Sequence, residues 1–172
     1  SLTNNNAEIY NGSSWTAIAT MNTTQRGRLG AGADNEAFIS IGGQSSTVDV
    51  ENWNGSSWTE VNNLNTAKTS TYGNMGTATA ALAVGYGSPN TTNESWNGSS
   101  WTETTDLNEA RDSQGGTGAG GSTSALSIGG VPPGGQPNGT ASVEEFAGNQ
   151  PIGGWSTGNS MNTARSDLGG AG

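Results

Sequence analysis

The sequence repeats itself every 43 residues, and this internal repeat constrains the fold more than any other feature. The motif Asn-Gly-Ser-Ser-Trp ends at Trp15, Trp58 and Trp101, and a degenerate fourth copy ends at Trp155. A Met-Asn or Leu-Asn pair begins six residues after each of these tryptophans. Self-similarity at this period indicates a fold built from copies of one supersecondary unit.

Each unit has the pattern of four short strands separated by turns. In the first full unit we expect a Gly-rich strand at 29–33, and an apolar strand at 37–41 that is buried on both faces because it does not alternate. An alternating strand follows at 48–53, and a last one at 58–61. Asn54-Gly55 between the last two strands predicts a tight hairpin turn. The final interval between tryptophans is longer, and its extra residues fall where turns are expected, including an insert at 131–142.

Composition excludes several kinds of chemistry. The chain contains no cysteine and no histidine, so it has no disulfide, no thiolate or imidazole metal site and no Ser-His or Cys-His nucleophile. We therefore expect no catalytic residues, no metal site and no cofactor. A formal charge of −9 argues against nucleic-acid binding. No stretch approaches the roughly 20 apolar residues that span a bilayer, so we expect no membrane insertion.

The repeated markers resemble those of the kelch family. They are the Gly42-Gly43 doublet after an apolar strand, an aromatic residue about ten positions later, and a tryptophan five positions beyond it. A basic residue also opens each unit, at Arg26, Lys68, Arg111 and Arg165, whereas Gly85-Tyr86 departs from the doublet. The resemblance implies an all-β fold in which each unit is a four-stranded antiparallel blade of a β-propeller.

The same resemblance divides the chain into blades. We expect outer strands of a partial blade at 1–24, complete blades at 25–67, 68–110 and 111–164, the last with inserted loops, and the first strand of a further blade at 165–172. This gives one strand fewer than the smallest four-blade ring. We therefore expect a segment of a larger ring, completed by the rest of a longer chain or by neighbouring subunits.

Residues that recur in every unit are expected to serve the architecture. We predict that the repeated tryptophans pack blade against blade, although aromatic faces can also stack on sugars. The repeated glutamates are predicted to pair with the basic residue of their unit, and a calcium site is the alternative. These glutamates are Glu8, Glu51, Glu94 and Glu144.

Positions that keep their register while changing chemistry suit a binding surface. Counting back two residues from the inner-strand glycine gives Arg28, Thr71, Ser113 and Asp167, which the resemblance places at the mouth of the channel. They also suit a solvated loop end. The second candidate surface is the long insert, represented by Val131, Pro132, Pro133, Gln136 and Asn138.

These observations favour a non-catalytic binding module, extracellular or attached to a virion, such as a phage tail fibre or a cell-surface adhesin that recognises a glycan or a protein. A purely structural subunit of a filament or virion is the first alternative. The second is a hydrolase that uses carboxylates at the mouth of the propeller, with Asp34, Asp112 and Asp167 as candidates.

Overall fold

The structure is a computed structural model that describes residues 4–44, 47–68, 73–85, 91–117, 121–133, 139–148 and 154–165. Apart from one 3-10 turn, η1 (Gly121–Thr123), the regular structure of these residues consists of β-strands. No helix in this part of the chain is long and apolar enough to cross a membrane.

Antiparallel pairing groups the strands into one hairpin and three four-stranded sheets. The N-terminal hairpin pairs β1 (Glu8–Tyr10) with β2 (Trp15–Ala17). Blade 1 contains β3 (Leu29–Gly32), β4 (Phe38–Ile41), β5 (Val50–Trp53) and β6 (Trp58–Glu60). Blade 2 contains β7 (Gly73–Thr77), β8 (Ala80–Val84), β9 (Asn93–Trp96) and β10 (Trp101–Thr104). Blade 3 contains β11 (Gly115–Thr117), β12 (Ser124–Ile128), β13 (Val143–Ala147) and β14 (Trp155–Thr157).

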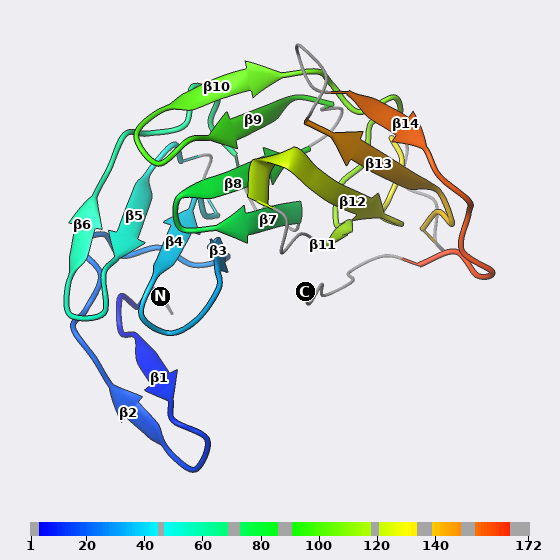
Figure 1. Cartoon of the computed structure of the whole chain (residues 1–172). Helices are drawn as coiled ribbons and strands as arrows, with labels where there is room; N and C mark the ends of the chain where they lie inside the picture. Colours follow the sequence, from blue (N-terminus) through cyan, green and yellow to red (C-terminus); the bar gives the residue numbers. More distant parts are fainter. Residues whose placement is uncertain are drawn as a thin grey trace.

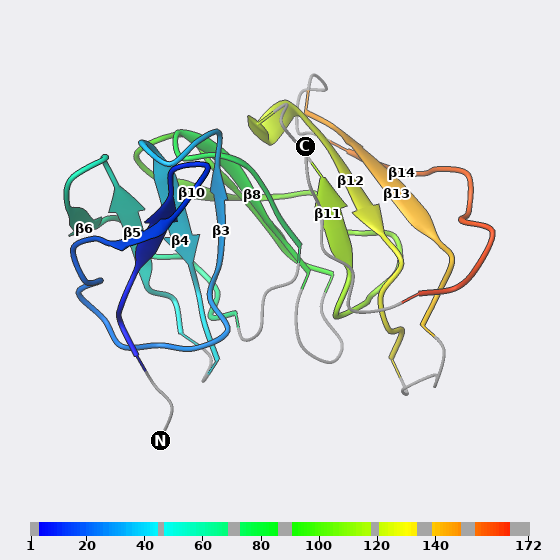
Figure 2. The same cartoon turned by 90° about the horizontal axis from the view of Figure 1, so that it is seen from below.

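The sheets follow one another around an arc (Figure 1). The N-terminal hairpin lies at one end and blade 3 at the other, and Figure 2 shows the sheets standing side by side. Strands β3, β7 and β11 lie on the inner side of the arc, where β7 contacts both of the others. The prediction of an all-β fold made of four-stranded blades is confirmed. The further strand expected at 165–172 lies, except for Arg165, outside the described residues.

The second strand of blade 2 shows why the apolar runs do not alternate. Ala81 and Ala83 belong to a core that blade 2 shares with blade 1, whereas Leu82 and Val84 belong to a core shared with blade 3. All four side chains are buried. Since successive residues of a strand point to opposite faces, a blade between two neighbours needs apolar residues at every position of this strand.

The Asn-Gly-Ser-Ser motif forms the outer hairpin loop, as the Asn54-Gly55 signal predicted. Trp53 pairs with Trp58, so the loop has four residues and is longer than a two-residue turn. The Asn54 side-chain oxygen accepts hydrogen bonds from the backbone N–H groups of Ser56 and Ser57, each at 3.0 Å. Gly55 has a φ of 89°, which favours glycine. Each residue type of the motif therefore has a local structural reason.

Candidate functional site: interblade contacts and an exposed aromatic groove

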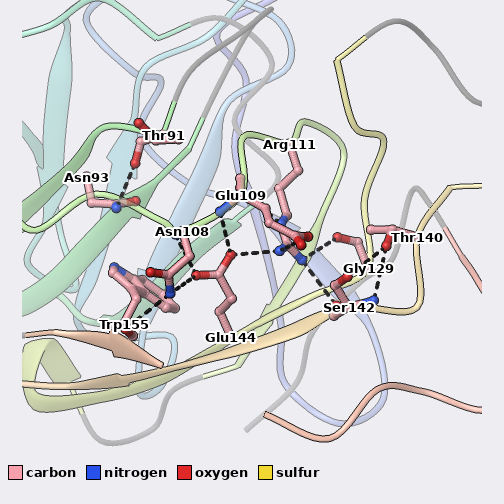
Figure 3. Close-up of polar contacts among 10 residues, drawn as sticks. All are labelled: Thr91, Asn93, Asn108, Glu109, Arg111, Gly129, Thr140, Ser142, Glu144 and Trp155. Atoms are coloured by element: carbon pink, nitrogen blue, oxygen red, sulfur yellow. Dashed lines mark hydrogen bonds and ion pairs between the residues drawn. The ribbon is translucent and has the colours of Figure 1, made fainter. Parts of the chain in front are cut away.

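A buried glutamate on the third strand of each complete blade binds the loop that enters from the preceding unit. In blade 3, the Glu144 carboxylate accepts hydrogen bonds from the Asn108 backbone N–H at 2.7 Å, the Asn108 side-chain amide at 2.9 Å and the Glu109 backbone N–H at 3.2 Å (Figure 3). Glu51 and Glu94 make the same contacts in blades 1 and 2. We call this arrangement the interblade latch.

The asparagine of the Met-Asn or Leu-Asn pair has a second role in the latch. Its side-chain amide also donates to the backbone carbonyl of the outer-strand tryptophan of the next blade, for example from Asn65 to Trp101 at 3.1 Å. Asn22 binds Trp58 and Asn108 binds Trp155 in the same way, each at 3.2 Å. Sequence reasoning found the repeated asparagine and the repeated glutamate but did not connect them. Their constant spacing in the first two latches was the available signal.

The cations complete the latches in three different ways. Arg111 and Glu144 form an ion pair at 2.7 Å with both side chains 1% exposed, which confirms the predicted pairing in blade 3. In blade 1 the partner of Glu51 is Arg28, at 3.3 Å, and not the expected Arg26. Lys68 of blade 2 donates to the Thr92 carbonyl at 3.1 Å and its hydroxyl at 3.3 Å.

Electrostatics favour the ionised form of the Glu51 latch. Burial by itself raises the pKa of Glu51, but hydrogen bonds from Thr23 and Asn22 and the charge of Arg28 outweigh it and hold the pKa below its ordinary value. Burial lowers the pKa of Arg28, and the Glu51 and Asp49 carboxylates oppose that effect. Burial likewise lowers the pKa of Lys68.

The strand register places two of the predicted channel-mouth residues at different positions. Leu29 pairs with Ile41 and Gly115 with Ile128, each just before a glycine doublet, so Arg28 corresponds to Gln114. Ser113 corresponds to Gly27, and both residues have positive φ values, 52° and 65°. The alignment that made Arg28 equivalent to Ser113 was therefore wrong by one residue.

The environments of these residues also differ. The Arg28 side chain is 9% exposed and held by the ion pair, so its visible contacts are structural. Ser113 is half-buried. Thr71 and Asp167 lie outside the described residues. A ligand-binding role for these four residues stays a prediction.

The long insert begins at a fixed point. The backbone N–H of Val131 donates to the Asp112 carbonyl at 2.8 Å, and the Asp112 N–H donates to the Val131 carbonyl at 3.0 Å. Pro132 is half-buried and Pro133 is exposed, whereas Gln136 and Asn138 lie outside the described residues. A binding role for this loop also stays a prediction.

An aromatic pair spans each outer hairpin, with ring centroids 5.1 to 5.4 Å apart. The prediction that the tryptophans pack between blades is confirmed for Trp101 and Trp155, which are 6% and 9% exposed. It is wrong for the N-terminal hairpin, because Trp15 is 67% exposed and its partner Tyr10 is 48% exposed. Sequence could not separate Trp15 from the other tryptophans because all of them carry the same motif.

A groove of about 570 Å³ lies between the N-terminal hairpin and blade 1. Aromatic rings dominate its lining, and the carboxylate residues Glu8 and Asp34 also contribute. Such a surface can stack on the apolar face of a sugar or cover apolar groups of a protein, while its carboxylates accept hydrogen bonds. The aromatic lining residues are Tyr10, Trp15, Phe38, Trp53 and Trp58. Within the described ranges, no three acidic residues gather closely enough to hold a metal ion.

No family model and no curated protein matches the sequence. Among solved structures, the chain is similar to the one titled "Structure of YjhT", with a TM-score of 0.66 over 91% of this chain and a sequence identity of 13%. The similarity covers 58% of the YjhT chain, so the present chain spans less than two thirds of it. At this level of identity the likeness concerns the fold alone, and it supports the propeller-like arrangement of the blades.

Proposed function

We propose that the chain is a non-catalytic interaction module of the kelch type, which recognises a surface glycan or a protein through the groove beside its N-terminal hairpin. The exposure of Tyr10 and Trp15 carries this proposal, because the equivalent pair in blade 2 is buried between blades at 2% and 6% exposure. Large aromatic residues left open to solvent beside a groove mark an interaction surface.

The proposed setting is a virion fibre or a cell-surface adhesin. The sequence supports it by its acidic, glycine-rich composition and by the absence of cysteine and histidine. Among the hydrolase candidates, Asp34 accepts hydrogen bonds from the backbone N–H groups of Glu36 at 2.9 Å and Ala37 at 3.1 Å, an ordinary turn contact. This contact gives Asp34 a structural role and does not support the hydrolase alternative.

Binding of the labelled chain to an array of immobilised glycans tests the glycan arm of the proposal. We expect Trp15→Ala to lose the glycans that the parent chain retains, and Thr16→Ala, an exposed neighbour on the same strand, to keep them. Far-UV circular dichroism of both variants checks that the hairpin stays folded. Full retention by Trp15→Ala would contradict the groove as the site.

A further inference from the structure

The interblade latch is directional. In all three occurrences, the loop after the outer strand of one unit supplies the donors, and the third strand of the following unit supplies the carboxylate. The chain therefore uses the donor loops at Asn22, Asn65 and Asn108 and the acceptors Glu51, Glu94 and Glu144. One acceptor and one donor loop of the same kind are left over, and they lie at opposite ends of the arc.

The free acceptor is Glu8 on β1, which pairs with Ala17 as Glu51 pairs with Glu60. Glu8 is exposed, and no described residue donates a hydrogen bond to its carboxylate. The free donor loop contains Asn162 and Thr163, which follow β14 as Asn108 and Glu109 follow β10. Both of these residues are exposed.

The apolar faces at the two ends show the same pattern. Ile39 and Ile41 of blade 1 are fully buried on the face that meets blade 2, whereas Ile128, the counterpart of Ile41 in blade 3, is only half-buried. At the other end, Trp15 is 67% exposed although Trp101, its counterpart, is 6% exposed beside blade 1. Each end thus carries one half of an interface that the chain builds twice between its complete blades.

We propose that a second copy of this chain occupies the N-terminal hairpin, head to tail. The Asn162-Thr163 loop of one copy donates to Glu8 of the next, and the Asn162 side-chain amide reaches the backbone carbonyl of Trp15. The same step covers Tyr10 and Trp15 with the apolar face of blade 3. This inference deepens the proposed function and rests on it, because it names the partner of the same surface. A head-to-tail contact closes into a ring or continues as a filament, according to the rotation between copies.

Light scattering coupled to size-exclusion chromatography tests the contact across a wide range of concentrations. We expect the parent chain to associate and Glu8→Ala and Asn162→Asp each to weaken association by roughly thirtyfold or more, as for the loss of a buried charged hydrogen bond. The matched controls Glu103→Ala and Asn159→Asp change the charge in the same way at exposed positions outside the latch and should associate like the parent.

Mixing the two latch variants tests the direction of the contact. The Glu8→Ala chain keeps its donor loop and the Asn162→Asp chain keeps its acceptor, so an equal mixture should form dimers and nothing larger. A parent chain that stays monomeric, or a Glu8→Ala variant that associates like the parent, would overturn the proposal and leave the hairpin to a different partner. A monomeric chain that binds glycans in a Trp15-dependent way would overturn this inference alone, and the proposed function would stand.

Discussion

Removing the carboxylate of Glu94 should destabilise the protein because three hydrogen bonds between blades depend on it. Glu94 is 1% exposed and accepts from the Asn65 backbone N–H at 2.8 Å, the Asn65 side chain at 2.8 Å and the Thr66 N–H at 3.0 Å. Hydrogen bonds to a charged group contribute about 1.5–3 kcal/mol each. Since Asn65 and Thr66 are themselves exposed, water can reach part of what Glu94→Ala leaves unpaired, and we expect a loss of about 3 kcal/mol.

Urea unfolding followed by tryptophan fluorescence and by circular dichroism measures this loss, provided that the two signals change together. Glu103→Ala is the matched control, because Glu103 lies directly opposite Glu94 on β10 and is exposed. Its removal should leave the midpoint unchanged. A loss below about 1 kcal/mol for Glu94→Ala, or an equal loss for the control, would refute the idea that the latch holds blades 1 and 2 together.

Three further predictions concern packing and charge. Trp101→Ala should lower the free energy of unfolding by about 3–5 kcal/mol, whereas Trp15→Ala should leave the urea midpoint unchanged, and equal effects would contradict the burial difference. Because the folded-state pKa of Glu51 is lowered, its contribution to stability is complete above the unfolded value of about 4.3 and is lost as pH falls through the lower folded value. The melting temperature in acid should therefore fall less steeply for Glu51→Gln than for the parent, and parallel profiles would count against this. Gly30→Ala places a Cβ inside the Phe38 ring and 2.5 Å from the Ile39 carbonyl, so its melting temperature should fall, whereas Gly154→Ala meets nothing within 4 Å and should not change it.

The strands of each blade could be predicted from sequence because their signals are local. The apolar run of β8, the glycine doublets and the Asn-Gly-Ser-Ser loops each follow from contacts within one unit or with an identical neighbour. Once the period was known, four strands per unit followed from turn chemistry and from burial on both faces.

The candidate site could not be predicted in the same way because it depends on which copies of a repeated residue have a neighbour. Trp15 and Trp101 share one motif, and their difference in exposure comes from packing alone. The cation that reaches Glu51 was also hidden, since Arg28 reaches it from a position two residues beyond the one expected. The one-residue difference between Arg28 and Ser113 in strand register became visible only from the pairing with β4 and β12.

The latch also determines how freely units can be exchanged. Asn108 lies 36 residues before Glu144, and removing one whole unit, residues 68–110, would bring Asn65 to the same separation from Glu144. The donor loop, the carboxylate and the tryptophan carbonyl would all still meet across the new junction. Unequal recombination between units could therefore lengthen or shorten the array without breaking a single contact type, provided that whole periods are gained or lost.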